Sequence, residues 1–308
     1  MKKTFRIIGA MALCAVIAPA FASCGDDDDD NGDIDVPETM DGTRLSAMNG
    51  SLISYDSKGR LVSAASPYSF QIDYSAGKIY LGSDDDDVMN IRFNGHGYVT
   101  ELSASWDYEE DDERYSGSGK TTFSYDKDGH ITKINSESKE KVTDLDDNSS
   151  WTENYKSRTD LTWTASNLAS VVTNGEENEP GDNDTWFSQY DYSYNGEVNA
   201  FQQMPMAVSG AYSDDDEYML MAAAGLFGKG PGFLPSSIDV KIIEDGRVNT
   251  ATVPLSYTLN TNGTISWERL GGAQTYHWVY NNVGGSHAPA KAKKAEKRHV
   301  RDFFVKKH

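Results

Sequence analysis

The chain has 308 residues, with 48 acidic residues against 28 Lys and Arg, so its formal net charge at pH 7 is -20. A body this acidic repels nucleic acids and anionic lipid surfaces, which excludes nucleic acid as a partner. The two cysteines, Cys14 and Cys24, both lie close to the N-terminus. We therefore expect no disulfide within the folded part of the chain.

Residues 1–23 have the layout of a secretory signal peptide. Lys2, Lys3 and Arg6 form a cationic start, and an apolar run covers residues 7–20. Such a run is typical of a signal peptide and is shorter than the roughly 20 apolar residues that a membrane-spanning helix needs. The leader therefore predicts export, and its removal makes the mature chain three units more negative.

The segment Phe21-Ala22-Ser23-Cys24 resembles the cleavage box of bacterial lipoproteins, although Phe21 stands where leucine is usual. The resemblance implies cleavage between Ser23 and Cys24 and acylation of Cys24. Two or more acyl chains anchor a protein stably to a membrane. An ordinary signal peptide followed by a chance cysteine is the alternative.

Residues 24–43 predict an acidic tether behind the lipidated cysteine. Five consecutive aspartates, Asp26–Asp30, follow Cys24 almost directly, and like charges extend a linker by repulsion. Acidic residues in this place also resemble the signal that exports some Gram-negative lipoproteins to the cell surface. A plain spacer remains the alternative. We expect a chain anchored in the outer membrane and exposed on the cell surface.

Residues 44–285 predict one all-β domain. Gly, Asn, Asp and Ser are abundant, and Tyr, Thr, Val, Ile and Trp recur with a period of two. In the run 186–194, for example, Tyr190, Tyr192 and Tyr194 fall on one face of a strand. No amphipathic helical pattern of comparable length competes with this interpretation.

A hairpin motif repeats along this domain. An aromatic or apolar residue ends one strand, a short polar loop with Gly or Asn reverses the chain, and an aliphatic residue starts the next strand. The seven copies are 55–61, 74–79, 93–99, 125–131, 163–168, 243–248 and 259–265.

Seven hairpins imply about a dozen strands in a large antiparallel up-and-down meander. A sheet this wide leaves exposed edges unless it closes, so we expect it to be curled or barrel-like. Polar loops are predicted near 144–150 and 174–184. The Ala-rich run 218–227 predicts one short helix that plugs or caps an end of the sheet, with a ligand lid as the alternative.

The order of these features resembles a family of bacterial lipoproteins of unknown function described as having a porin-like β fold. The resemblance covers about Leu52 to Tyr280. It rests on the repeated hairpins, Tyr192-Ser193-Tyr194-Asn195, the helix ending Gly225-Leu226-Phe227-Gly228, and Phe233-Leu234-Pro235-Ser236-Ser237-Ile238. It implies a fold and an envelope location, but no activity and no functional residues.

A membrane-spanning porin is not expected. The odd positions of the run 151–163 share one face, and Glu153 lies in the middle of that face. A carboxylate facing lipid is costly, and a lipid anchor is redundant on a barrel that spans the membrane. The alternation therefore favours a soluble β-meander.

The search for catalytic chemistry finds no nucleophile elbow, zinc motif or phosphate loop. His96 and His130 fall in predicted turns, where solvated side chains are expected, and His277 is expected to be structural. The acidic runs 84–87, 109–113 and 214–217 lack the spacing of a calcium loop, so a solvated acidic surface is the favoured interpretation. We expect no catalytic residue, cofactor or metal.

Aromatic residues are the better functional lead. Trp106, Trp151 and Trp186 lie in strand-like runs rich in Asp, Glu and Asn, and such residues on a β-surface form stacking platforms for sugars. Burial in the core remains the alternative for each of them.

Residues 286–308 form a basic tail that reverses the charge of the body. Its part 291–305 has the composition of a helix with Val300, Phe303 and Phe304 on one side. It is predicted either to fold back on the acidic body, to bind an anionic surface, or to be an appendage.

Together these features favour a non-catalytic, surface-anchored module that binds a glycan or an envelope partner. A structural component of the envelope and a hydrolase with paired carboxylates are the alternatives.

Overall fold

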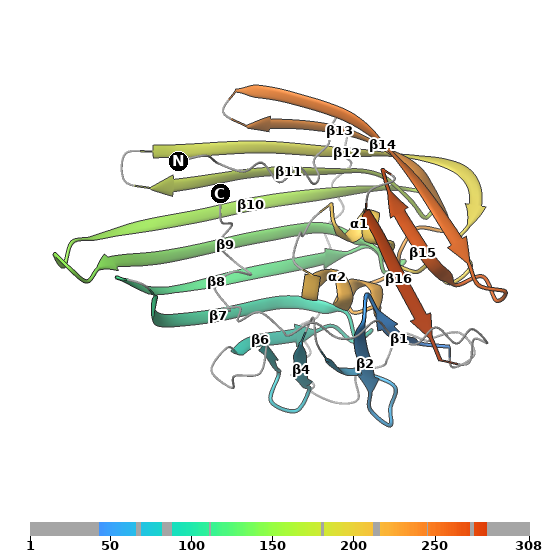
Figure 1. Ribbon diagram of the computed structural model, residues 1–308, viewed down its shortest axis with the longest axis horizontal. Helices are drawn as coiled ribbons and strands as arrows, with labels where there is room; N and C mark the ends of the chain where they lie inside the picture. The colour runs from blue at the N-terminus through green and yellow to red at the C-terminus, as the bar shows by residue number, and fades with distance from the viewer. Residues whose placement is uncertain are drawn as a thin grey trace.

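The chain forms a closed antiparallel β-barrel of sixteen strands (Figure 1). The computed structural model describes residues 43–281 apart from 66–68, 82–87, 111, 180–181, 212–215, 245 and 272–273. Each strand pairs with its sequence neighbours, and β1 closes the barrel by pairing with β16. The all-β, up-and-down, barrel-like fold predicted from the sequence is therefore confirmed.

The strands differ greatly in length. The short strands are β1 (Leu45–Met48), β2 (Ser51–Tyr55), β3 (Leu61–Ala64), β4 (Phe70–Asp73), β5 (Lys78–Leu81), β6 (Val88–Phe93), β15 (Ile265–Leu270) and β16 (Gln274–Tyr280). The long strands are β7 (Val99–Glu110), β8 (Glu113–Tyr125), β9 (Ile131–Asp144), β10 (Ser150–Thr164), β11 (Asn167–Glu179), β12 (Asp182–Val198), β13 (Phe233–Glu244) and β14 (Arg247–Leu259).

The long strands project beyond the short ones on one side of the molecule (Figure 1). At roughly 3.4 Å per residue, a strand of twelve or more residues is at least twice as long as β1 to β6. We call the projecting ends of β7 to β12 the extension. The barrel is thus closed at one end and continues as an open curved sheet at the other.

The predicted hairpin motif marks one end of the barrel, which we call the turn end. Six of the seven copies join an even-numbered strand to the next odd-numbered one, from β2–β3 to β14–β15. The seventh, 243–248, joins β13 to β14 at the opposite end. The expectation of about a dozen strands was too low because most hairpins at that opposite end lack the motif.

Four of these turns share one hydrogen-bond pattern. At the β8–β9 turn, the Asp126 backbone N–H donates to the carbonyl of His130, and the Gly129 N–H donates back to the Asp126 carbonyl. Gly129 has φ of +89°, a conformation that favours glycine. The turns that begin at Asp56, Asn94 and Asn260 repeat both bonds.

Aromatic side chains tie these turns to the barrel. A Tyr or Trp near the end of an even-numbered strand donates to a carbonyl at the start of the preceding strand. The pairs are Tyr55 to Leu45 (2.8 Å), Tyr74 to Leu61 (2.9 Å), Tyr125 to Val99 (2.5 Å), Trp163 to Ile131 (2.6 Å) and Tyr194 to Leu168 (2.8 Å). The aromatic position of the motif is therefore structural.

His130 corrects the expectation of a solvated turn residue. Its side chain is only 3 % exposed and stacks on Trp163 with 4.3 Å between ring centroids. Its Nδ1 lies 3.1 Å from Asp126 Oδ2. The sequence did not reveal this because the turn folds over a tryptophan that lies 33 positions further along the chain.

Two helices fill the barrel near the turn end. The chain between β12 and β13 forms α1 (Met206–Ser209) and α2 (Asp216–Ala223), which lie against the inner face of the strands (Figure 1). Leu220 and Met221 of α2 are fully buried. The expected plug helix is present, but it ends at Ala223 instead of residue 227. Gly225 has φ of +90°, which is not a helical conformation, so the chain leaves the helix before this residue. The short helix α1 was not predicted.

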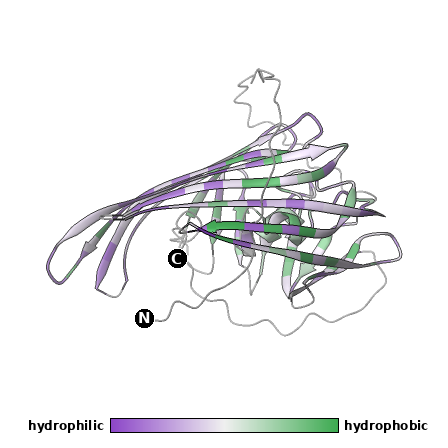
Figure 2. Ribbon diagram, turned by 90° about the horizontal axis from the view of Figure 1, so that it is seen from above, coloured by the Kyte–Doolittle hydropathy of each residue, from purple (hydrophilic) through white to green (hydrophobic). Residues whose placement is uncertain are grey.

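The apolar core surrounds these helices. Phe227 follows α2 and stacks on Tyr218 and Phe123 with centroid distances of 5.2 and 4.9 Å. In Figure 2 the hydrophobic colour gathers mainly around the helices, and the projecting strand ends are largely polar. The closed end therefore holds the main hydrophobic core, and the extension is stabilised by contacts other than this core.

A buried carboxylate anchors α1 to the barrel wall. Glu268 of β15 is 0 % exposed, and its two oxygens accept hydrogen bonds of 2.8 Å from the backbone N–H groups of Met206 and Ala207. Burial raises the pKa of Glu268 to about 7, against the lowering effect of these two hydrogen bonds.

The outer face of the long strands is polar. On β9 and β10 the inward side chains include Ile134, Val142 and Leu161, which are buried. The alternate, outward positions are Lys133, Asn135, Glu137, Lys139, Lys141, Thr152, Asn154, Lys156, Arg158, Asp160 and Thr162. Each Lys or Arg facing the middle of a bilayer costs about 2–4 kcal/mol, so this face suits water.

Glu153 is therefore not the carboxylate that would face lipid, contrary to the expectation from the sequence. It lies on the inner face of β10, and the charges that oppose contact with lipid are the outward ones. No helix within the described ranges is long and apolar enough to cross a membrane.

The predicted loop at 174–184 is also wrong, because residues 174–179 extend β11 and 182–184 begin β12. The polar sequence suggested a loop, but strands exposed to water on their outer face need no apolar alternation. The predicted signal peptide 1–23, the predicted tether up to residue 42 and the basic tail 286–308 lie outside the described residues.

Replacing Gly129 with alanine should destabilise the barrel by roughly 1–3 kcal/mol, because a side chain is strained at φ of +89° and its Cβ would lie 3.0 Å from the Tyr98 ring. Urea unfolding measures this. Gly95→Ala is the matched control, since no atom lies within 4 Å of its Cβ and its φ is not positive. Equal stability of the two variants would contradict the turn model.

Glu268 should make the barrel less stable as pH rises from about 4.5 to 7. Its pKa is higher in the folded chain than in the unfolded one, so the folded chain keeps a proton that the unfolded chain loses in this window. The contribution is fully present below pH 4.5 and amounts to roughly 3 kcal/mol at most. The free energy of unfolding in urea should differ less between pH 5 and pH 8 for Glu268→Gln than for the unmodified chain. The same difference in both proteins would contradict the assignment of this pH dependence to Glu268.

Candidate functional site

The three tryptophans predicted as a platform lie on one face. Residues two apart on a strand share a face, and Leu102 of β7, Leu161 of β10 and Tyr190 of β12 belong to the buried core. Counting along each strand in steps of two places Trp106, Trp151 and Trp186 on the same inner face, within the extension. The structure thus brings together residues that are up to 80 positions apart in the sequence.

Trp106 is held flat against the sheet. It is 6 % exposed, and its Nε1 donates a 2.5 Å hydrogen bond to Glu140 Oε1. Gly117, its cross-strand partner, allows this arrangement, because a Cβ there would lie 2.8 Å from the indole ring. Trp106 is therefore fixed in orientation and presents little surface of its own.

Trp186 and Trp151 are half-buried. Trp186 lies across Gly175, where a Cβ would come within 1.9 Å of the indole, and it stacks on Tyr155 at 5.2 Å between centroids. Trp151 donates from Nε1 to Glu153 Oε1 at 2.6 Å. Each indole is thus oriented by a neighbouring glycine, ring or carboxylate.

Carboxylates and small side chains complete this face. Glu140 and Glu153 are directly opposite each other on β9 and β10, and Glu177 is opposite Tyr155. Between the aromatic residues, cross-strand rows are occupied by small side chains, namely Gly119, Thr121, Ser136, Ser138, Ser157, Thr159 and Thr173. We call the whole set the aromatic–carboxylate face.

This face has further aromatic members beyond the three tryptophans predicted as a platform. Tyr108 and Tyr115 stack at 5.3 Å between centroids near the far end of the extension, and Tyr155 stacks on Trp186. A detectable signal existed, because Gly117 and Gly175 interrupt strands without a turn, and a glycine inside a strand often marks a place where a ring approaches the backbone.

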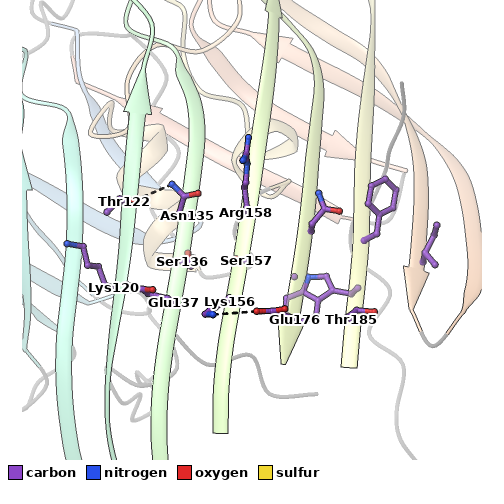
Figure 3. A pocket seen from close by; sticks show the side chains of 15 residues that line it. Lys120, Thr122, Asn135, Ser136, Glu137, Lys156, Ser157, Arg158, Glu176 and Thr185 are labelled. Atoms are coloured by element: carbon purple, nitrogen blue, oxygen red, sulfur yellow. Dashed lines mark hydrogen bonds and ion pairs between the residues drawn. The ribbon is translucent and has the colours of Figure 1, made fainter. Parts of the chain in front are cut away.

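The opposite face of the same strands carries a cavity of about 640 Å³ (Figure 3). Most of its lining comes from outward positions of β8 to β13 and mixes charges of both signs, and Trp186, Gly175, Ser136 and Ser157 of the inner face also contribute to it. Lys156 lies 3.6 Å from Glu176, and Asn135 Nδ2 lies 3.5 Å from Thr122 Oγ1. These exposed pairs are weak in water, and the mixture of charges selects no ligand class.

The remaining candidate residues form no metal site within the described part of the chain. No group of three or more His, Cys, Asp or Glu side chains there is placed to hold a metal ion. The acidic run 84–87 and residues 214–215 of the run 214–217 lie outside the described residues, as does Cys24. His277 stacks on Trp267 at 4.1 Å on the outer face of β15 and β16.

Comparison with known proteins gives a structural neighbour and little else. No family model matches the chain, and no curated protein matches it. Among solved structures, a porin-like protein from Bacteroides uniformis aligns with 81 % of this chain and 100 % of its own, with 10 % identity and a TM-score of 0.29. Similarity this low carries no argument about function.

Proposed function

We propose that this protein is a lipid-anchored envelope protein that binds a glycan on the aromatic–carboxylate face of its barrel. The observation that carries the proposal is the common orientation of Trp151 and Trp186, which are half-buried on the inner face of β10 and β12. Each of these two indoles is fixed by a specific neighbour, and the buried Trp106 lies on the same face.

The chemistry of the face fits carbohydrate. Sugar rings have apolar C–H faces that pack on aromatic rings, and their hydroxyls donate hydrogen bonds that carboxylates accept. Trp151 and Trp186 supply the rings, and the half-buried Glu153 supplies a carboxylate. Small side chains between them let a ring of the ligand come close to the sheet. No catalytic step is proposed, because the carboxylates Glu140 and Glu153 each hold an indole.

The envelope location rests on the N-terminus. Acylation of Cys24 and an acidic tether place the barrel outside the inner membrane, and the aspartates 26–30 support export to the cell surface. The polar outer face of the long strands agrees with a barrel that is held at a membrane by a lipid and surrounded by water.

The aromatic residues should dominate glycan affinity. A glycan array probed with the full-length chain identifies the ligand, and titration of that oligosaccharide should show about tenfold weaker binding for Trp151→Ala and for Trp186→Ala. Gly175→Ala should weaken binding as well, because it forces the Trp186 indole off the sheet while retaining it.

Trp267→Ala is the matched control, because Trp267 is 37 % exposed on the outer face. Equal losses for Trp267→Ala and Trp186→Ala would place the site elsewhere. An array without any signal, together with constant co-purification with one membrane complex, would instead support a structural role in the envelope.

Cys24→Ser should release the protein from the membrane fraction, because the acyl chains on Cys24 are the proposed anchor of the barrel. Fractionation of cells and labelling with a palmitate analogue measure this. Retention of the variant in the outer membrane, at the level of the unmodified chain, would contradict lipid anchoring and support a barrel that inserts by itself.

A further inference from the structure

A second cavity, of about 830 Å³, lies at the turn end of the barrel. Turns of the short strands form one wall, and the chain from α2 to β13 forms another. We call it the turn-end cavity. Its volume is in the range of pockets that hold small organic ligands, and it is separate from the aromatic–carboxylate face.

The charge of this cavity is opposite to that of the protein. Arg44, Arg60 and Lys229 line it, and none of its described lining residues is Asp or Glu. The chain as a whole has 48 acidic residues against 28 Lys and Arg. A local excess of cations in an acidic protein creates a potential that attracts an anion.

Two of the cations have donors that no described neighbour uses. The Nε of Arg60 donates to Asp56 Oδ2 at 2.8 Å, and its guanidinium lies over the Tyr74 ring at 4.2 Å. This contact fixes the guanidinium and leaves its two Nη groups for another acceptor. Lys229 is exposed, and none of the described residues forms an ion pair with it.

The local backbone holds these groups in place. Arg44 lies across the turn at Gly59, where a Cβ would be 2.1 Å from Arg44 Nη2, and over the ring of Tyr55 at 5.4 Å. Lys229 follows Gly228, and its backbone N–H donates to the carbonyl of Gly129 at 2.9 Å. The Arg44 side chain and the Lys229 backbone are therefore each held against a turn of the barrel.

The rest of the lining is largely apolar. Val198, Phe201 and Leu226 contribute to the wall, and Val198 is 56 % exposed. An inorganic anion would contact only the cations and leave this wall in water. An anion with an apolar body uses both parts of the cavity, because burying the apolar part adds affinity.

We propose that the turn-end cavity binds a small organic anion, with its carboxylate attracted by the cationic side chains of the lining and its apolar part against Val198, Phe201 and Leu226. The proposal does not depend on glycan binding. The two sites lie at different ends of the long strands and recognise different chemistry.

The probe is 3-phenylpropionate, titrated by calorimetry into the full-length chain, with 3-phenylpropanol as the neutral analogue and inorganic phosphate as the anion without an apolar body. We expect binding of 3-phenylpropionate that weakens at high salt, and much weaker binding of the other two. No binding of 3-phenylpropionate at 5 mM, or equal binding of the alcohol or of phosphate, overturns the proposal.

Lys229→Gln should weaken binding of 3-phenylpropionate about five- to tenfold, since it removes one charged donor. Lys127→Gln, an exposed lysine of the β8–β9 turn that does not line the cavity, is the matched control and should leave affinity unchanged. Arg60→Gln should weaken binding further, with its melting temperature measured to confirm folding. An unchanged affinity for Lys229→Gln, or equal losses for the two lysine variants, overturns the proposal.

Discussion

The hydrogen bond from an aromatic side chain to the first carbonyl of the preceding strand is the interaction on which this barrel depends. It recurs from Tyr55 to Tyr194 and always at the turn end. Each bond ties the end of one strand to the start of its neighbour. Because a shift by one residue moves every side chain to the other face, these ties set which face is buried. The division between an apolar interior and a polar exterior follows from them.

These hydrogen bonds form at the turn end only, and this explains why the strands differ in length. At the turn end, tight turns, five aromatic donors and the helices inside the barrel hold the strands together. At the other end strands can lengthen without a partner across the barrel, because their outward side chains are polar. The extension then needs another source of order on its inner face. Rings that lie flat on Gly117 and Gly175 supply it, since they cover the backbone with apolar surface.

The two proposed sites reflect this division. The aromatic–carboxylate face exists because the extension is a single curved sheet whose inner face lies beyond the helices. The turn-end cavity exists because turns and the inserted chain between β12 and β13 meet without filling the space between them. Glu268 of β15 holds α1 in that inserted chain through two backbone N–H groups, so it helps to shape the cavity.

The sequence alone determined the class of fold, because the period of two along the strands and the glycine in most of the hairpins are local properties that do not depend on distant contacts. It also indicated the plug helix and the tryptophans, by composition. The number of strands, the closure of β1 on β16 and the burial of His130 depended on contacts between distant segments, and short polar turns carry no signal for these. Only the tertiary structure decided that Trp106, Trp151 and Trp186 share a face. Their register depends on the whole series of strand pairings from β7 to β12, which no local pattern contains.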